Sequence, residues 1–213
     1  MTSETTYGFD TLQIHAGARP DPATGSRQTP IYQSTAFVFR DADHAAALFN
    51  LQEVGYIYSR LTNPTVAVLQ ERIATLEGGV GAVCCSSGHA AQIMALFPLM
   101  QPGRNVVVST RLYGGSITQF SQTIKRFGWG AKFVDFDDLD AVKAAIDDDT
   151  RAVFCESIAN PGGYITDLPA ISALSDEAGL PLIVDNTSAS AYLCRPIEHG
   201  ATLVVNSTTK FLT

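Results

Sequence analysis

The sequence predicts an α/β fold, in which an extended N-terminal arm precedes a mainly parallel sheet covered by helices on both faces. From residue 81 onward, short apolar runs rich in β-branched residues alternate with helical patterns, which is typical of strand–helix–strand units. Hydrophobic residues make up 46% of the chain and charged residues only 16%. That balance fits strands covered on both faces better than a half-exposed antiparallel sheet. At 213 residues, the chain is long enough to bury a full core.

The N-terminal third is less regular than the rest. Residues 11–39 show no sustained period and contain Pro20, Pro22 and Pro30, which predicts an extended arm. Residues 43–53 predict a short helix. A clearer helix begins at Pro64, which suits the first helical position, and ends before the glycine pair 78–79.

The remaining segments alternate regularly. Strands are predicted at 82–85, 105–109, 132–135, 152–156, 181–185 and 201–207, and helices at 90–100, 115–127, 139–146 and 168–178. In parallel sheets, ligands bind at the carboxyl ends of the strands. Ser87, Asp185 and Ser207 all fall at such ends.

Charge and composition narrow the class of partner. A net charge of −7 argues against nucleic acid. The first seven residues have neither a basic nor an apolar region, so we expect no export signal, and no apolar run is long enough to cross a membrane. The four cysteines show no Cys-x-x-Cys spacing, and Cys84, Cys85 and Cys155 lie in apolar runs. They predict reduced thiols in or near a core and a cytoplasmic protein. The four histidines lack ligand spacing, so we expect no metal.

Two residues at the ends of buried strands point to pyridoxal phosphate (PLP). Asp185 ends the run 182–184, and Lys210 follows the run 202–205. A lysine amine can form a Schiff base with the cofactor's aldehyde, and a carboxylate can keep the ring nitrogen protonated so that the ring accepts electrons. The hydroxyls of Ser207 and Thr209 alternate on one face, in position to hold the phosphate.

Two glycine-containing turns support a cofactor site. At Ser87-Gly88-His89 a strand leads into a helix, where glycine lets a phosphate approach the free N–H groups of the first helical turn. The alternative is a plain strand–helix turn with a serine N-cap. Tyr113 precedes two glycines after another strand and could stack on a pyridine ring, although an ordinary turn explains it equally well.

These motifs occur in an order that resembles the transsulfuration family of PLP-dependent enzymes, also called the Cys/Met metabolism family. The matching segments are Tyr58-Ser59-Arg60, Asn63-Pro64-Thr65, Leu76-Glu77-Gly78-Gly79, Ser87-Gly88, Leu112-Tyr113-Gly114-Gly115, Glu156, Asn160-Pro161, Val184-Asp185-Asn186-Thr187 and Ser207-Thr208-Thr209-Lys210-Phe211. The resemblance implies the large domain of the type I PLP-dependent transferases. Within the family, segments 11–17, 20–25, 30–33 and 44–49 are most similar to O-acetylhomoserine sulfhydrylases.

The resemblance also implies a role for each matched position. Lys210 would carry the cofactor and move protons, Asp185 would pair with the ring nitrogen, and Tyr113 would stack on the ring. Tyr58 and Arg60 would reach the phosphate held by a neighbouring subunit, which predicts dimers with shared active sites, assembled into a homotetramer. The remaining cofactor-binding positions are Ser87, Gly88, His89, Asn160, Thr187, Ser207 and Thr209.

The activity implied is γ-replacement on an amino-acid substrate, O-acetylhomoserine, with sulfide or a thiol, giving homocysteine or methionine and acetate. Cystathionine γ-synthase, cystathionine γ-lyase and methionine γ-lyase share this machinery and stay open. So do a catalytically incomplete fragment that keeps the fold and an α/β module for a phosphorylated metabolite. We expect residues 1–60 to form an arm that contacts a second subunit, and residues 61–213 to form an incomplete PLP domain. Relatives are longer, and their small C-terminal domain supplies the arginine for the substrate carboxylate.

Overall fold

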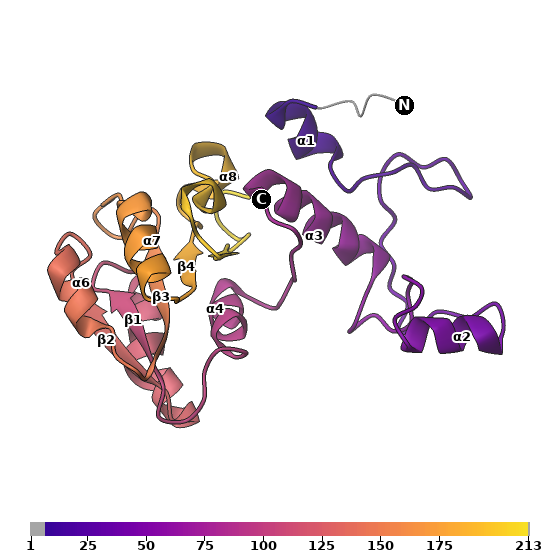
Figure 1. Ribbon diagram of the computed structural model, residues 1–213. Helices are drawn as coiled ribbons and strands as arrows, with labels where there is room; N and C mark the ends of the chain where they lie inside the picture. The colour runs from indigo at the N-terminus through magenta and orange to yellow at the C-terminus, as the bar shows by residue number, and fades with distance from the viewer. Residues whose placement is uncertain (1–6, 213) are drawn as a thin grey trace. The chain divides into compact units, whose positions relative to one another are not determined.

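The computed structural model describes residues 7–212, which divide into two compact units between Cys84 and Cys85 (Figure 1). Most of the segment on which the expectation of no export signal rests, residues 1–6, lies outside the described residues. No helix in the described range is long and apolar enough to cross a membrane. The predicted domain boundary after residue 60 stays a prediction.

The first unit contains three helices: α1 (Phe9–His15), α2 (Ala42–Phe49) and α3 (Pro64–Glu77). The N-terminus of α3 is capped as its sequence predicts, because the side chain of Asn63 accepts a hydrogen bond from the N–H of Thr65 and proline follows the cap. Gly78 ends the helix at φ +77°. The sequence predicted an extended arm without regular structure over residues 11–39. Helix α1 corrects this prediction, because it includes residues 11–15.

Hydrogen bonds hold two distant segments of this unit together. The N–H of Phe37 donates to the carbonyl of Ile57 at 3.1 Å, and the N–H of Ser59 donates to that of Thr35 at 2.9 Å. The amide of Asn63 adds a bond to the carbonyl of Tyr32 at 2.9 Å. These contacts fix the backbone on both sides of Tyr58.

The second unit is built on a five-stranded sheet in which every neighbouring pair is parallel, so the predicted fold class is confirmed. The strand order is β2-β1-β3-β4-β5. The strands are β1 (Asn105–Ser109), β2 (Gly130–Val134), β3 (Thr150–Glu156), β4 (Leu182–Asp185) and β5 (Leu203–Val205).

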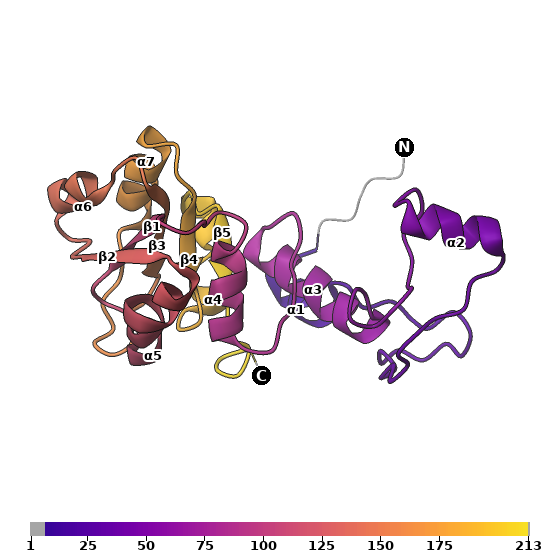
Figure 2. The ribbon, with the colours of Figure 1, turned by 90° about the horizontal axis from the view of Figure 1, so that it is seen from below.

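Helices cover both faces of this sheet. Figure 2 shows α6 (Leu139–Ala145) and α7 (Leu168–Glu177) on one side and α5 (Gly114–Thr118) on the other. Helix α4 (Gly88–Leu96) packs on the α5 side, where one core contains Leu96, Val108 and Phe154. The α6 and α7 side has its own core around Val107 and Val153. Side chains that alternate along β1 and β3 therefore supply two separate cores. Short helical segments complete the unit: α8 (Ser190–Leu193), a π-helix (Gln119–Thr123) and two 3₁₀-helices (Ile124–Phe127 and Pro196–His199).

Three expectations from the sequence are wrong. Residues 82–85 are irregular rather than a strand, and Val83 is 74% exposed. Cys84 and Cys85 are consequently exposed rather than in or near a core, whereas Cys155 is buried as expected. The single helix predicted at 115–127 is divided into α5, the π-helix and the 3₁₀-helix.

Candidate active site

A cavity of about 640 Å³ opens at the carboxyl ends of the strands in the second unit. The chain goes from β1 to β2 at one edge and then returns to the other side of β1 to form β3. Ligands bind next to such a reversal of strand order in open α/β sheets. The cavity is lined by residues that follow β1, β3, β4 and β5 and by the start of α4. Among them are the predicted site residues Ser87, Gly88, His89, Tyr113, Asn160, Asp185, Thr187, Ser207 and Lys210.

Asp185 presents a buried carboxylate at the end of β4, where it is only 8% exposed. Its Oδ1 accepts a hydrogen bond from the N–H of Thr187 at 3.0 Å, and its Oδ2 accepts one from Nε2 of Gln92 at 2.9 Å. Each oxygen therefore has a fixed donor, which a buried carboxylate requires. The carboxylate is held in one orientation at the cavity wall.

Gln92 belongs to a buried polar network that sequence reasoning missed. It is 2% exposed, and its Nε2 also donates to the hydroxyl of Ser116 at 3.0 Å. Its Oε1 accepts from Nε2 of Gln119 at 2.8 Å, and Gln119 lies in the π-helix. The one signal in the sequence was that Gln92 stands among the apolar residues of the predicted helix 90–100. The sequence did not show which residues would form hydrogen bonds with it.

The start of α4 forms a close-packed anion cradle. Ser87 caps the helix by accepting from the N–H of Ala90 at 3.1 Å. A Cβ on Gly88 would lie 2.8 Å from the Cβ of Ser207, so only glycine allows the two segments to approach this closely. Ser207 is held in turn by Thr187, whose Oγ1 accepts from the N–H of Ser207 at 2.8 Å. Free helical N–H groups and hydroxyls at one point suit a phosphate.

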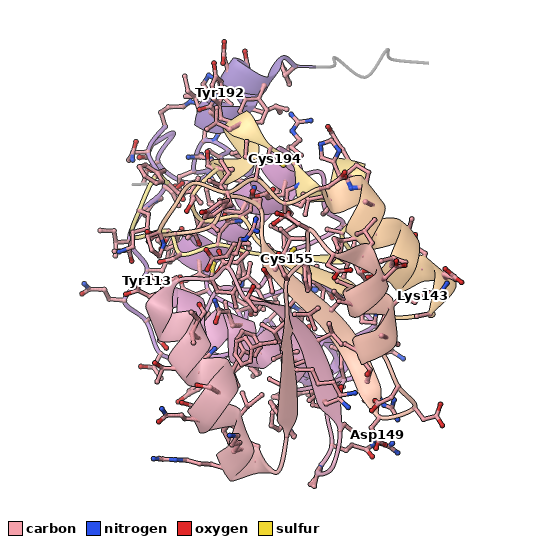
Figure 3. All side chains as sticks on the ribbon, turned by 90° about the vertical axis from the view of Figure 1, so that its left-hand side faces the viewer. Tyr113, Lys143, Asp149, Cys155, Tyr192 and Cys194 are labelled. Atoms are coloured by element: carbon pink, nitrogen blue, oxygen red, sulfur yellow. The ribbon has the colours of Figure 1, made fainter. Side chains whose placement is uncertain are left out.

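Tyr113 and His89 stack on each other beside this cradle. Their ring centroids are 5.9 Å apart with an interplanar angle of 23°, and Tyr113 is 50% exposed. A Cβ on Gly115 would come within 2.7 Å of both rings, so this glycine makes room for the pair. His89 was predicted as a cofactor-binding position, and the structure shows that its ring contacts Tyr113. In Figure 3, Tyr113 and Asp149 lie toward opposite ends of the sheet.

Glu156, at the end of β3, is a second buried carboxyl group in the cavity wall, 5% exposed. Its Oε1 accepts from the N–H of Tyr113 at 2.7 Å, and its Oε2 accepts from the N–H of Asn160 at 3.0 Å. Burial raises the pKa of Glu156 to about 7, against the two N–H donors that lower it, and the nearby Asp185 raises it further. Burial also raises the pKa of the adjacent Cys155 thiol.

The residues of the cavity fit PLP. A buried carboxylate, an anion cradle and a lysine open to one space match the ring nitrogen, phosphate and aldehyde of this cofactor. Lys210 is exposed and lines the cavity, and its N–H donates to the carbonyl of Ser207 at 3.3 Å. Thr209 is exposed and is not among the lining residues.

Two predicted residues belong to the first unit. The guanidinium carbon of Arg60 lies 5.3 Å from the ring centroid of Tyr58, and both side chains are solvent-accessible. Their part in a shared site stays a prediction. Within residues 7–212, no group of three or more His, Cys, Asp or Glu side chains is placed to hold a metal ion.

Comparison with known proteins agrees with this geometry. The family model described as "Cys/Met metabolism PLP-dependent enzyme" matches residues 10–213. An O-acetyl-L-homoserine sulfhydrylase of Corynebacterium glutamicum is 50% identical over 208 residues, which are 97% of this chain and 48% of that protein. The chain spans about half the length of the curated relatives it matches.

Two solved structures have nearly the same fold. One is a putative O-acetylhomoserine (thiol)-lyase from Campylobacter jejuni with N'-pyridoxyl-lysine-5'-monophosphate. It has a TM-score of 0.93 at 42% identity and covers 97% of this chain and 51% of its own. The other is a cystathionine γ-lyase from Lactobacillus plantarum complexed with L-serine. It has a TM-score of 0.87 at 36% identity, with the same coverage of both chains.

Proposed function

The chain belongs to the Cys/Met metabolism family of PLP-dependent enzymes, and on this basis we propose that it forms the cofactor-binding part of an O-acetylhomoserine sulfhydrylase. The observation that carries the proposal is the single cavity shared by Asp185, Lys210 and the Gly88 cradle. Relatives with 46 to 50% sequence identity to this chain are named as homocysteine synthase or O-acetyl-L-homoserine sulfhydrylase, and these names support the choice of reaction.

When bound, PLP supplies an aldehyde that condenses with amines and a protonated ring that accepts an electron pair from the substrate. The chain's own residues create the conditions for this chemistry. The anion of Asp185, fixed by Gln92 and Thr187, favours a proton on the ring nitrogen. The start of α4 and Ser207 would bind the phosphate. The amine of Lys210 would hold the cofactor through its aldehyde and would move protons at the substrate's α- and β-carbons.

The proposed reaction replaces the γ-acetoxy group of O-acetylhomoserine with sulfide or a thiol. The C–O bond at the γ-carbon breaks to release acetate, and a new C–S bond gives homocysteine or a thioether such as methionine. We further propose that the working unit is a homo-oligomer in which Tyr58 and Arg60 bind the phosphate of a neighbouring subunit. The tetrameric assembly and cytoplasmic location stay predictions.

The reaction is tested with the protein expressed from its complete reading frame. With O-acetylhomoserine and sulfide, we expect homocysteine and acetate in equal amounts. Formation of cystathionine from cysteine, or of a keto acid and ammonia without sulfide, is measured in parallel. If either of these exceeds homocysteine formation, the sulfhydrylase assignment is wrong and the synthase or lyase alternative replaces it.

The role of Lys210 is tested separately with Lys210→Ala. Lys143→Ala is the matched control, because Lys143 lies on α6 and forms an exposed ion pair with Glu177 at 2.7 Å. Borohydride reduction should link the cofactor to the wild type and to Lys143→Ala but not to Lys210→Ala. Peptide mapping that places the cofactor on any other lysine refutes the assignment.

A further inference from the structure

Glu156 connects two loops that both line the cavity. Its carboxylate accepts one hydrogen bond from the backbone of each loop, at Tyr113 after β1 and at Asn160 after β3, over 2.7 and 3.0 Å. The side chain is buried. None of the roles assigned above to the chain's residues uses it.

Each loop also has contacts that do not join it to the other loop. After β3, the N–H of Ala159 donates to the carbonyl of Tyr164 at 2.8 Å, and the N–H of Thr166 donates to that of Ser157 at 3.1 Å. After β1, Tyr113 is the N-cap residue of the five-residue helix α5, and its side chain makes no capping hydrogen bond. Arg111 also lies over the ring of Tyr164 at 4.4 Å, but Tyr164 is 53% exposed. A cation–π contact at an exposed site is weaker than hydrogen bonds to a buried carboxylate.

We propose that Glu156 is a positioning residue that sets the distance between Tyr113 and Asn160, and thereby preforms the slot that receives the flat ring of the cofactor. This inference rests on the proposed function, because it assumes that PLP occupies the cavity. Among the described residues, both hydrogen bonds to the Glu156 carboxylate come from backbone N–H groups, so we propose that it acts through Tyr113 and Asn160 rather than on the substrate. When the slot is formed before binding, the loops lose less conformational entropy on binding the cofactor, so the affinity is higher.

The test uses Glu156→Gln, which keeps the size of the side chain but has a single acceptor oxygen. One of the two N–H groups then faces an amide NH₂ and loses its bond. Hydrogen exchange of the cofactor-free protein, followed by mass spectrometry, should become faster in the peptides that contain Tyr113 and Asn160, while strand β4 keeps its protection. The affinity for PLP, measured by absorbance titration, should fall about tenfold to a hundredfold, as expected when a buried donor loses its acceptor.

The matched control is Asp147→Asn. Asp147 is also a carboxylate that accepts several hydrogen bonds, from Lys132, Asn105 and Thr150. It precedes β3, however, and therefore lies at the opposite end of the strands from Glu156. Its loss should lower stability while leaving exchange at both loops and PLP affinity within about twofold of the wild type. If Glu156→Gln does not fold, Glu156→Asp serves instead, because the shorter side chain cannot reach both N–H groups.

The outcomes separate this inference from the proposed function. Faster exchange at the loops together with weaker PLP binding supports the positioning role. Unchanged exchange at both loops, or faster exchange with unchanged PLP affinity, overturns it. Wild-type protein that binds no PLP refutes the proposed function, whereas the exchange data still decide whether Glu156 holds the two loops together.

Discussion

Two carboxyl groups, those of Glu156 and Asp185, lie side by side at the carboxyl ends of neighbouring strands. Their hydrogen-bond partners differ. Glu156 of β3 is the direct register partner of Asp185 of β4. Asp185 accepts from a side-chain amide and a backbone N–H, whereas both partners of Glu156 are backbone N–H groups of separate loops. Adjacent carboxyl groups that are held differently can take different charges and so serve different purposes at one pH.

The raised pKa of Glu156 predicts how stability changes with pH. In the folded, cofactor-free protein this pKa is about 7, above the usual 4.5, so between these values the folded state binds more protons than the unfolded state. The contribution of Glu156 to the free energy of unfolding should therefore decrease as pH rises through this window and level off above it. We expect a decrease of about 1 to 3 kcal/mol, reduced from the full value because the cavity admits water.

Urea denaturation of the wild type and Glu156→Gln at several values between pH 5 and pH 8 measures this change. The difference between the two proteins isolates Glu156, since other titrating groups contribute equally to both. Asp147, whose pKa is lowered chiefly by its bond to Lys132, loses its contribution only at more acidic pH and does not interfere. A difference that stays constant or grows with pH would contradict the raised pKa of Glu156.

At the scale of elements, α4 links the glycine turn at Gly88 to the buried carboxylate of Asp185. Its first residue is Gly88. Gln92, one turn later, donates a hydrogen bond to Asp185. Residues four apart lie on the same face of a helix, so the spacing places both functions toward the cavity. The helix therefore fixes the position of Gly88 relative to Asp185.

Gln92→Met should disturb both stability and cofactor binding. The change removes the donor to Asp185 and leaves a buried carboxylate oxygen without this bond, which costs about 1 to 3 kcal/mol of unfolding free energy. PLP affinity should fall about tenfold by the same reasoning. Thermal unfolding and absorbance titration measure the two effects.

Ser116→Ala is the control for this experiment, because it removes another partner of Gln92 and leaves the bond to Asp185 in place. It should change PLP affinity by less than about twofold. Equal losses of affinity in both variants would mean that the network matters only for folding, and that Gln92 does not act on Asp185.

Sequence patterns predicted most of these elements, and the failures have physical causes. Strands β1, β3 and β4 were found because both faces are buried, which produces continuous apolar runs. The run at 82–85 has the same composition but no neighbouring strand in the structure, and composition does not reveal pairing. The π-helix at Gln119–Thr123 adds one residue per turn, which a helical period cannot show.

Site residues were predictable where they belong to a recognisable motif at the end of a strand or the start of a helix. Asp185 and Gly88 are of this kind, and the structure places both in the cavity wall. The partners of these residues were not predictable in the same way. Gln92 lies 93 positions from Asp185, and Glu156 lies 43 positions from Tyr113. Such pairs depend on strand order, which the sequence pattern leaves open.

At the scale of the whole molecule, the predicted site residues are divided between the two units. The cavity is lined by residues of the second unit, whereas Tyr58 and Arg60 belong to the first. A guanidinium binds phosphate through two parallel N–H donors. The guanidinium of Arg60 lies over the exposed ring of Tyr58, and Arg60 takes part in none of the ion pairs among residues 7–212. A site completed by a second copy of the chain would use this cation.

Mixing two inactive variants tests the shared site. Arg60→Ala and Lys210→Ala are prepared from the complete reading frame and allowed to exchange subunits. If Arg60 acts on the neighbouring subunit, a hybrid dimer has one site with both defects and one site with neither. About a quarter of the wild-type activity should then return, since half of the dimers are hybrids at equal mixing and half of their sites are intact.

The control mixes Lys210→Ala with Asp185→Asn. Both residues line the same cavity of the second unit, so every site in a hybrid dimer carries one of the two defects. No activity above that of the separate variants should return. Mass spectrometry of differently tagged subunits confirms exchange in both mixtures. If exchange is complete and the Arg60→Ala mixture stays as inactive as the control, Arg60 serves its own subunit. The cavity would then have to receive Arg60 from the same chain, and Tyr58 beside it would lose its assigned role across the interface.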